Sequence, residues 1–184
     1  MLPNDPLTAA RILIVDDEDS NVRLLEAILR RDGYTDLMSM TDSRLAVPRF
    51  AEFHPDLVLL DLMMPLMDGF EVMEELKTRI PPETYVPILV LTADLARDSR
   101  NRALSMGAND FLTKPFDQDE VTLRIHNLLH TRALYLRVQE EQTKLEERVQ
   151  ERTRELRESL TLLEETAEEH RHLIDRLIAS QQAS

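Results

Sequence analysis

Residues 57–71, with the sequence LVLLDLMMPLMDGFE, decide the fold of this chain. Four consecutive apolar residues lead to Asp61, and a short loop then reaches Asp68 and Gly69, where we expect a turn and the start of a helix. A continuous apolar run of this length is typical of a strand that is buried on both faces, as in a parallel sheet. The stretch therefore predicts one strand–helix unit with an acidic residue at its junction.

The same alternation recurs through the first 130 residues. Strands are expected at residues 11–15, 37–40, 56–60, 86–91 and 110–113. Amphipathic segments of helical length follow them, at residues 20–32, 43–53, 69–78, 96–106 and 117–130. Five such alternations predict an α/β fold: a doubly wound, five-stranded parallel sheet of the flavodoxin-like kind, with helices on both faces.

Polar residues follow four of these strands. They are Asp16 and Asp17 after the first strand, Asp61 after the third, Thr92 after the fourth, and Lys114, which Pro115 follows, after the fifth. Ligands of such sheets bind beyond the carboxyl ends of the strands. We therefore expect three carboxylates, a hydroxyl and an ammonium group to converge at one edge.

This set of groups suits phosphoryl transfer. Clustered carboxylates repel one another unless a cation is present. Mg²⁺ is the expected cofactor, because it prefers carboxylate oxygens, water and phosphate. Asp61 comes from a central strand and is the best-placed nucleophile for an aspartyl phosphate, while Lys114 and Thr92 can neutralise the transferred oxygens.

Four segments together carry a family resemblance. ILIVDDE (residues 12–18), LVLLDLMMPLMDGFE (57–71), ILVLTA (88–93) and GANDFLTKPF (107–116) resemble the receiver domains of two-component response regulators, of the kind typified by the chemotaxis regulator. The resemblance covers residues 10–130 and implies a sensor histidine kinase as the phosphoryl donor.

The resemblance also implies a metal site. Asp61 would be the phosphoacceptor, Asp17 would bind Mg²⁺ directly, and Asp16 would act mainly through water. The backbone carbonyl of Met63 would complete the protein ligands. We further expect the apolar side chain of Met63 to slow dephosphorylation, because it lies two positions after Asp61.

Switch residues follow from the same resemblance. Lys114 would pair with the acyl phosphate, and Thr92 would turn inward to bind the phosphoryl group. Phe111 occupies the aromatic switch position, where many relatives carry Tyr, so contacts that need a hydroxyl are lost. Pro115 would follow a cis peptide bond. Gly69 is expected to have a structural role.

Beyond residue 130 the sequence predicts one long helix without Gly or Pro. A heptad seam includes Leu145 and Val149, and a second register begins at Thr153 after a stutter. We expect residues 1–9 to be a flexible segment, 10–130 a receiver domain, and 131–184 a coiled-coil signalling helix that forms a homodimer. The alternative is a solvated single helix.

Three functions remain open at this point. The favoured one is a phosphorylation-activated response regulator that relays the change through a dimeric coiled coil to a partner or an absent output domain. The second is a constitutive coiled-coil scaffold built on a pseudo-receiver. The third is a fragment of a larger enzyme, because LEERVQERTRELRESL (residues 145–160) resembles signalling-helix linkers before diguanylate cyclases, HD-type phosphodiesterases, phosphatases or kinases. Apart from self-phosphorylation and autodephosphorylation, no enzymatic activity is expected of the chain itself.

Composition limits the partners and the compartment. A net charge of −13 disfavours direct binding to nucleic acid. The absence of cysteine fits a reducing compartment. No apolar run reaches the roughly 20 residues that span a bilayer, and the N-terminus has no secretory pattern. We therefore expect a cytoplasmic protein without a membrane partner.

Overall fold

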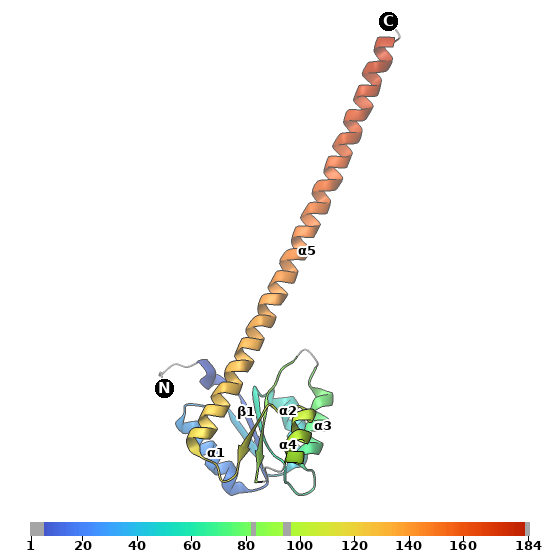
Figure 1. The fold of residues 1–184 in the computed structure, drawn as a ribbon. Coiled ribbons are helices and arrows are strands. Elements are labelled where there is room, and N and C mark those ends of the chain that lie inside the picture. Colours follow the sequence, from blue (N-terminus) through green and yellow to red (C-terminus); the bar gives the residue numbers. More distant parts are fainter. Residues whose placement is uncertain (1–5, 82–83, 94–96, 183–184) are drawn as a thin grey trace. The chain divides into compact units, whose positions relative to one another are not determined.

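The computed structural model describes residues 6–81, 84–93 and 97–182 (Figure 1). The chain divides into two units, Met1–Leu136 and Arg137–Ser184. The first unit is an α/β domain and the second is helical. Residues 1–5 of the expected flexible segment lie outside the described residues, and Pro6–Ala9 form a short 3₁₀ helix, η1.

Five parallel strands form the sheet of the first unit, in the order β2-β1-β3-β4-β5. They are β1 (Ile12–Val15), β2 (Leu37–Met40), β3 (Leu57–Asp61), β4 (Ile88–Thr92) and β5 (Asp110–Thr113). The predicted fold class is confirmed. The three central strands are buried along their whole length, which explains their continuous apolar runs, whereas the edge strand β2 is only half-buried.

Helices cover both faces of the sheet. They are α1 (Asp19–Arg31), α2 (Ala46–Phe53), α3 (Gly69–Arg79), α4 (Arg97–Met106) and α5 (Gln118–Gln182). Alternate residues of β1 point to opposite sides: Ile12 and Ile14 pack with α1 and the first turns of α5, and Leu13 and Val15 pack with α2, α3 and α4. Two apolar clusters therefore hold the sheet rigidly between the helix layers.

Most of the expected boundaries shift by one or two residues, and one expected segment is divided. Strands β3 and β4 each begin and end later than expected, so Asp61 and Thr92 are the last residues of their strands. The segment expected as one helix at 43–53 is a 3₁₀ turn, η2 (Ser43–Leu45), followed by α2. The Asp42 carboxylate accepts a hydrogen bond from the Arg44 N–H, which caps the tighter turn.

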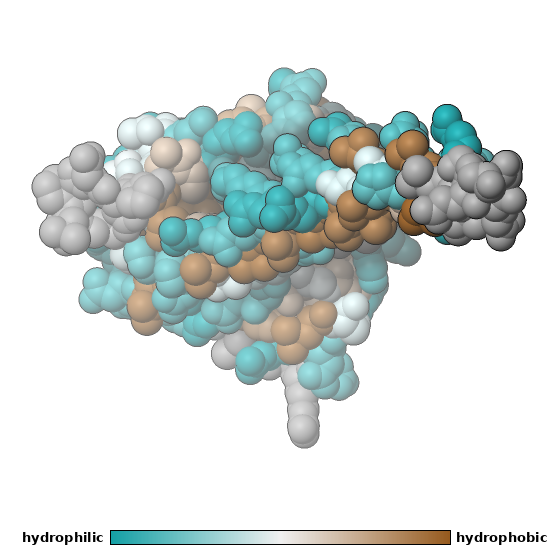
Figure 2. All heavy atoms as spheres, turned by 90° about the horizontal axis from the view of Figure 1, so that it is seen from above, coloured by the Kyte–Doolittle hydropathy of each residue, from teal (hydrophilic) through white to brown (hydrophobic). Residues whose placement is uncertain are grey.

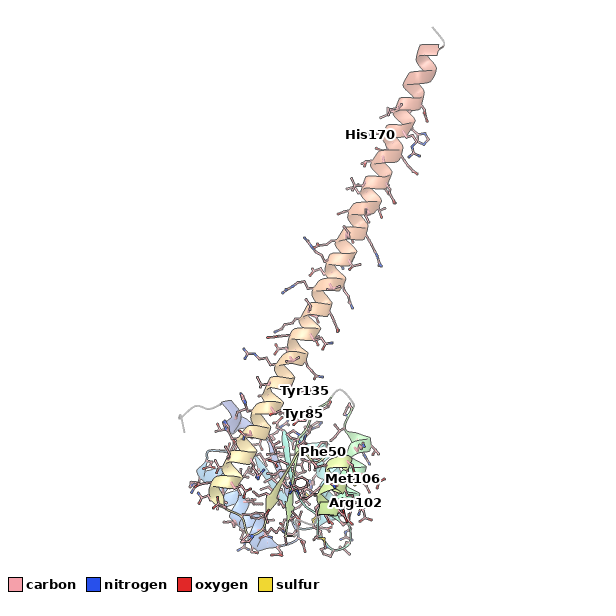
Figure 3. The ribbon with its side chains drawn as sticks, viewed as in Figure 1. Phe50, Tyr85, Arg102, Met106, Tyr135 and His170 are labelled. Carbon is pink, nitrogen blue, oxygen red and sulfur yellow. The ribbon has the colours of Figure 1, made fainter. Side chains whose placement is uncertain are left out.

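Arg132 and Tyr135, about four turns into α5, anchor the helix at the amino-terminal edge of the sheet. Arg132 forms an ion pair with Asp56, the residue before β3, at 3.2 Å, and it donates a hydrogen bond to the Tyr85 carbonyl. The rings of Tyr85 and Tyr135 lie 5.4 Å apart (Figure 3). α5 thus contacts the starts of the two strands whose other ends carry Asp61 and Thr92.

The second unit is a single helix with exposed side chains. Every described side chain from residue 140 to 176 is exposed, and ion pairs such as Glu140–Lys144 join successive turns. The apolar residues of the predicted seam include Leu145, Val149, Leu156, Leu160, Leu163 and Ile174. Figure 2 shows apolar side chains exposed among polar ones on the face that it presents. None of the described helices is long and apolar enough to cross a membrane.

Candidate functional site

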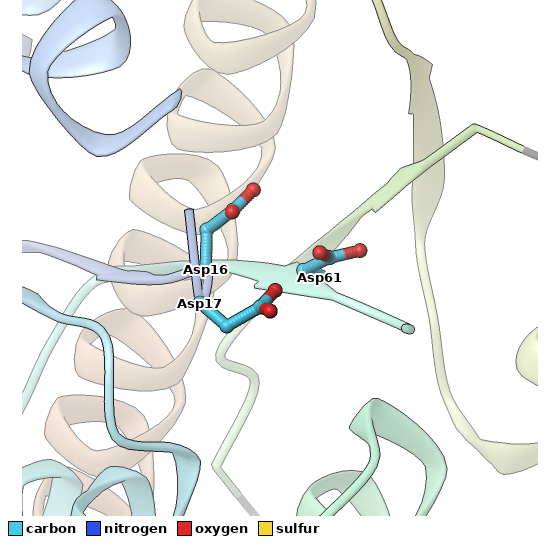
Figure 4. Close-up of side chains that lie close together, drawn as sticks. All are labelled: Asp16, Asp17 and Asp61. Atoms are coloured by element: carbon cyan, nitrogen blue, oxygen red, sulfur yellow. The ribbon is translucent and has the colours of Figure 1, made fainter. Parts of the chain in front are cut away.

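Three aspartates meet at the carboxyl edge of the sheet (Figure 4). Asp16 and Asp17 follow β1, and Asp61 ends the neighbouring strand β3. One carboxylate oxygen from each lies within 4.8 Å of the other two. Asp16 is fully buried, Asp61 is 2% exposed, and Asp17 is half-buried, so Asp17 forms the side of the group that solvent reaches most easily.

Lys114 links two of these carboxylates. Its Nζ lies 2.8 Å from Asp16 Oδ2 and 2.7 Å from Asp61 Oδ2. The Lys114 N–H donates to the Thr92 carbonyl at 2.9 Å, which ties the ends of β4 and β5 together. The Lys114–Pro115 peptide bond is cis.

Burial dominates the electrostatics of Asp61. It raises the pKa of Asp61 above the ordinary value, against the hydrogen bonds from Lys114 and from the Met63 N–H at 3.2 Å. Burial acts in the opposite direction on Lys114, but hydrogen bonds with Asp16 and Asp61 outweigh it and raise the Lys114 pKa. Lys114 is therefore a permanent positive charge beside Asp61 at neutral pH.

Asn21 is a member of the site that the sequence did not indicate. Its side-chain amide nitrogen lies 3.1 and 3.2 Å from the two carboxylate oxygens of Asp16, and the Glu18 N–H donates to Asp16 Oδ1 at 2.9 Å. These contacts fix the orientation of a fully buried carboxylate. The signal in the sequence that could have indicated Asn21 was its position in the first turn of the helix that follows Asp16.

The donor set fits a magnesium ion. Three carboxylates against one ammonium group leave the pocket with excess negative charge when all are ionised. All the clustered ligand atoms are hard oxygens, the type that Mg²⁺ prefers. The Met63 backbone belongs to the same loop, since its N–H already bonds Asp61. The three aspartates of the predicted metal site are thus brought together.

The loop after Asp61 is closed by a tight backbone contact. The Gly69 N–H donates to the Leu62 carbonyl at 3.0 Å, and a Cβ on Gly69 would lie 2.3 Å from the Asp61 carbonyl oxygen. Asp68 caps α3 through a reciprocal capping box with Glu71. The helix begins at Gly69 as expected, but the glycine is needed there for close approach and not for turn geometry.

The two predicted switch residues lie on adjacent strands. Thr92 is buried at the end of β4, and Phe111 is buried on β5, where the Arg100 guanidinium lies 5.3 Å from the ring centre. Phe111 packs in the cluster under α3 and α4. Thr92 therefore lies at the carboxyl edge of the sheet, as the aspartates do, and Phe111 lies on the face of the sheet that α3 and α4 cover.

Fold and site together define a class of protein: a doubly wound α/β domain with an acidic pocket of three aspartates at the carboxyl edge of its sheet. Residues 12–126 match the response regulator receiver domain family, and the chain belongs to that family. It is similar to the response regulator PleD of Caulobacter vibrioides, with 43% identity over 120 residues, which are 65% of this chain and 26% of PleD.

Other relatives place the similarity in the same region. The alkaline phosphatase synthesis transcriptional regulatory protein PhoP of Bacillus subtilis is 40% identical over 119 residues, which are 65% of this chain and 48% of PhoP. The solved structure of the Vibrio cholerae chemotaxis protein CheY4 superposes with a TM-score of 0.61 at 26% identity, covering 65% of this chain and 98% of that one. The match spans about a quarter of PleD and about half of PhoP.

Proposed function

We propose that this protein is a phosphorylation-activated response regulator that accepts a phosphoryl group on Asp61 from a sensor histidine kinase. The observation that carries the proposal is the bridge from Lys114 to Asp61 and Asp16, with Asp17 beside them. A buried nucleophile, a fixed cation and spare oxygen ligands are the parts that phosphoryl transfer requires.

In the proposed reaction, an oxygen of ionised Asp61 forms a bond to phosphorus while the nitrogen–phosphorus bond of the donor phosphohistidine breaks. Lys114 lies 2.7 Å from Asp61 Oδ2 and would hold an oxygen of the acyl phosphate. The Thr92 hydroxyl would bind another. Asp17, Asp61 and the Met63 carbonyl would hold Mg²⁺, with Asp16 acting through water, and the ion would neutralise the phosphoryl oxygens.

Met63 is proposed to set the phosphoryl lifetime. Its side chain is 72% exposed and follows Asp61 by two residues, on the solvent side of the loop. An apolar side chain at this position cannot orient an attacking water molecule by hydrogen bonding. Met63→Asn should therefore speed autodephosphorylation, and an unchanged lifetime would count against this role.

The output is proposed to pass through α5. Inward movement of Thr92 and Phe111 would change the face formed by α4, β5 and α5. The contacts of α5 with Asp56 and Tyr85 support a second connection, because those residues begin the strands that end at Asp61 and Thr92. Such a charge-driven change can bias an element that has two arrangements.

We further propose that residues 131–184 form a parallel coiled-coil homodimer and that residues 10–130 are the receiver. Support comes from the exposed seam, since each large apolar side chain gains roughly 1.5–3 kcal/mol on full burial. The acidic net charge supports a protein partner instead of nucleic acid. The proposed compartment is the cytoplasm.

A second candidate is a piece of a larger receiver-linked enzyme. It is supported by the resemblance of residues 145–160 to signalling linkers and by a solved structure titled as a two-component response regulator/GGDEF domain protein, which is 26% identical and aligns with a TM-score of 0.63 over 70% of this chain and 52% of that one. The coding sequence after Ser184 tests this candidate directly.

The proposed function is tested with acetyl phosphate and Mg²⁺. Intact mass should show one added phosphoryl group in the wild type and none in Asp61→Asn or without Mg²⁺. Light scattering on the same samples measures the oligomer. A folded, Mg²⁺-supplied protein that takes no phosphoryl group from acetyl phosphate or from a phosphorylated kinase would favour the constitutive scaffold.

A further inference from the structure

An exposed leucine lies on the loop that follows the phosphoacceptor. In the first unit, the two most exposed large apolar side chains among the described residues are Met63 and Leu66, at 72% and 77%. Both belong to the loop between β3 and α3. Single exposed apolar side chains are common on protein surfaces, but these two share one short loop directly after Asp61, where they form neighbouring apolar surface beside the acidic pocket.

The backbone at Leu66 is strained. Its φ is +74°, and the Met67 N–H donates to the Pro65 carbonyl at 2.9 Å across it. These two features define a γ-turn of the rare, strained kind. A leucine in this region of φ costs roughly 1–2 kcal/mol relative to the right-handed region, a penalty that glycine avoids. Because Leu66 is 77% exposed, burial in the folded chain offsets little of that cost.

The loop that carries Leu66 is nevertheless held in place. The Ser43 hydroxyl donates to the Pro65 carbonyl at 3.3 Å, and Ser43 is buried. The Gly69 N–H closes the other end on Leu62. A loop whose backbone is already held loses little backbone entropy when a partner covers it, so Leu66 is presented in a position suited to binding.

The short distance between Leu66 and Asp61 indicates which partner would cover Leu66. Asp61 is almost fully buried, so a protein donor must bring its phosphohistidine into direct contact with this edge. An ordinary protein interface covers about 800 Å² on each side, a disc of about 16 Å radius. Leu66 is five residues from Asp61, which is at most roughly 17 Å even for extended chain, and the closed loop shortens that reach.

We infer that Leu66, with Met63 beside it, is a docking residue for the phosphohistidine-bearing domain of the donor kinase. This inference rests on the proposed function of Asp61. Leu66 contacts the kinase surface around the phosphohistidine and is covered when the complex forms. It affects the rate with a protein donor far more than the rate with a small donor, which needs no such surface.

The test compares two donors on the full chain. Acetyl phosphate is the small donor, and the protein donors are purified, autophosphorylated histidine kinases of the source organism, from which the fastest is taken. Leu66→Asn keeps a residue that tolerates positive φ but removes the apolar surface, and Leu66→Gly also removes the strain. Leu104→Asn, at an exposed position on α4, is the matched control.

The ratio of the kinase-driven rate to the acetyl phosphate rate should fall about tenfold in both Leu66 variants and should stay at the wild-type value in Leu104→Asn. Unfolding measurements should show that both Leu66 variants are at least as stable as the wild type. An unchanged ratio overturns the docking role, as does a panel in which acetyl phosphate reacts and no kinase does. Loss of self-association in the Leu66 variants with an unchanged ratio would instead assign the surface to a second copy. Failure of acetyl phosphate to react with the wild type would refute the proposed function itself.

Discussion

Gly69→Ala should destabilise the globular unit, because there is no room for a methyl group at this position. A Cβ atom on Gly69 lies 2.3 Å from the Asp61 carbonyl oxygen and 2.8 Å from Leu62 Cα. Both are backbone atoms at the end of β3, so no side-chain rotation relieves the overlap. Either β3 or the first turn of α3 must move, and the Gly69–Leu62 hydrogen bond must lengthen.

The size of the effect follows from these contacts. Carbon–oxygen contacts are ordinarily about 3.3 Å or longer, so the backbone segments must separate by about 1 Å. Overpacking costs about 1–3 kcal/mol, and a weakened buried hydrogen bond adds about 1 kcal/mol. The expected loss is therefore about 2–4 kcal/mol, or roughly 6–16 °C in Tm for a domain of this size.

Tyrosine fluorescence during urea unfolding measures this loss in the right unit. The chain has no Trp, and its tyrosines, Tyr34, Tyr85 and Tyr135, all lie in the first unit. Gly107 is the control position, because it has a φ of +109° but nothing within 4 Å of its Cβ position. Gly107→Asn should therefore lose less stability than Gly69→Asn, since only Gly69 lacks room for a side chain. A loss below about 0.5 kcal/mol in Gly69→Ala would refute the steric reasoning.

Four further substitutions test the electrostatics and the anchoring of α5. Because burial raises the Asp61 pKa, the folded state binds that proton more tightly than the unfolded chain, and stability falls as pH rises through the raised pKa. Asp61→Asn should therefore raise Tm at pH 7, by an amount that shrinks as pH falls toward the ordinary carboxyl value of 3.8. Lys114→Met leaves Asp16 and Asp61 buried without their cation and should cost about 3–5 kcal/mol in calorimetry at neutral pH, and less in acid. Asp56→Asn and Arg132→Gln should show a coupling energy of about 1 kcal/mol in a double-mutant cycle, whereas additive effects would mean that their ion pair does not anchor α5.

The parallel sheet was predictable because its strands are short and buried on both faces. Such strands appear in sequence as unbroken apolar runs, and the polar residue that ends each run must lie at one edge. This is why Asp16, Asp61 and Lys114 could be grouped before any coordinates were known. The break between η2 and α2 was less accessible, because a capped 3₁₀ turn and the first turn of an α-helix have similar sequences.

Three features of the site depend on tertiary contacts that a sequence does not encode locally. Asn21 orients Asp16 only because α1 begins at a particular angle after β1. Gly69 reads as a turn glycine, whereas its actual constraint is the backbone of a strand eight residues earlier. Leu66 carries no turn signal at all, since leucine is not a residue that normally favours positive φ.

The protein alone does not balance the charge of the pocket, either when its carboxylates are ionised or when Asp61 carries a phosphoryl group. With its carboxylates ionised, Lys114 offsets only one of three negative charges, and a cation is needed to offset more. Converting a carboxylate to an acyl phosphate adds about one further negative charge in the same space. The ammonium group of Lys114 is already shared between Asp16 and Asp61, so it cannot hold the phosphoryl group without weakening a bond to at least one of them. The backbone of Lys114 is also tied to the end of β4, because its N–H is bonded to the Thr92 carbonyl. Under the proposed function, a phosphoryl group on Asp61 would therefore act first on Lys114, the residue that joins the ends of the strands carrying Thr92 and Phe111.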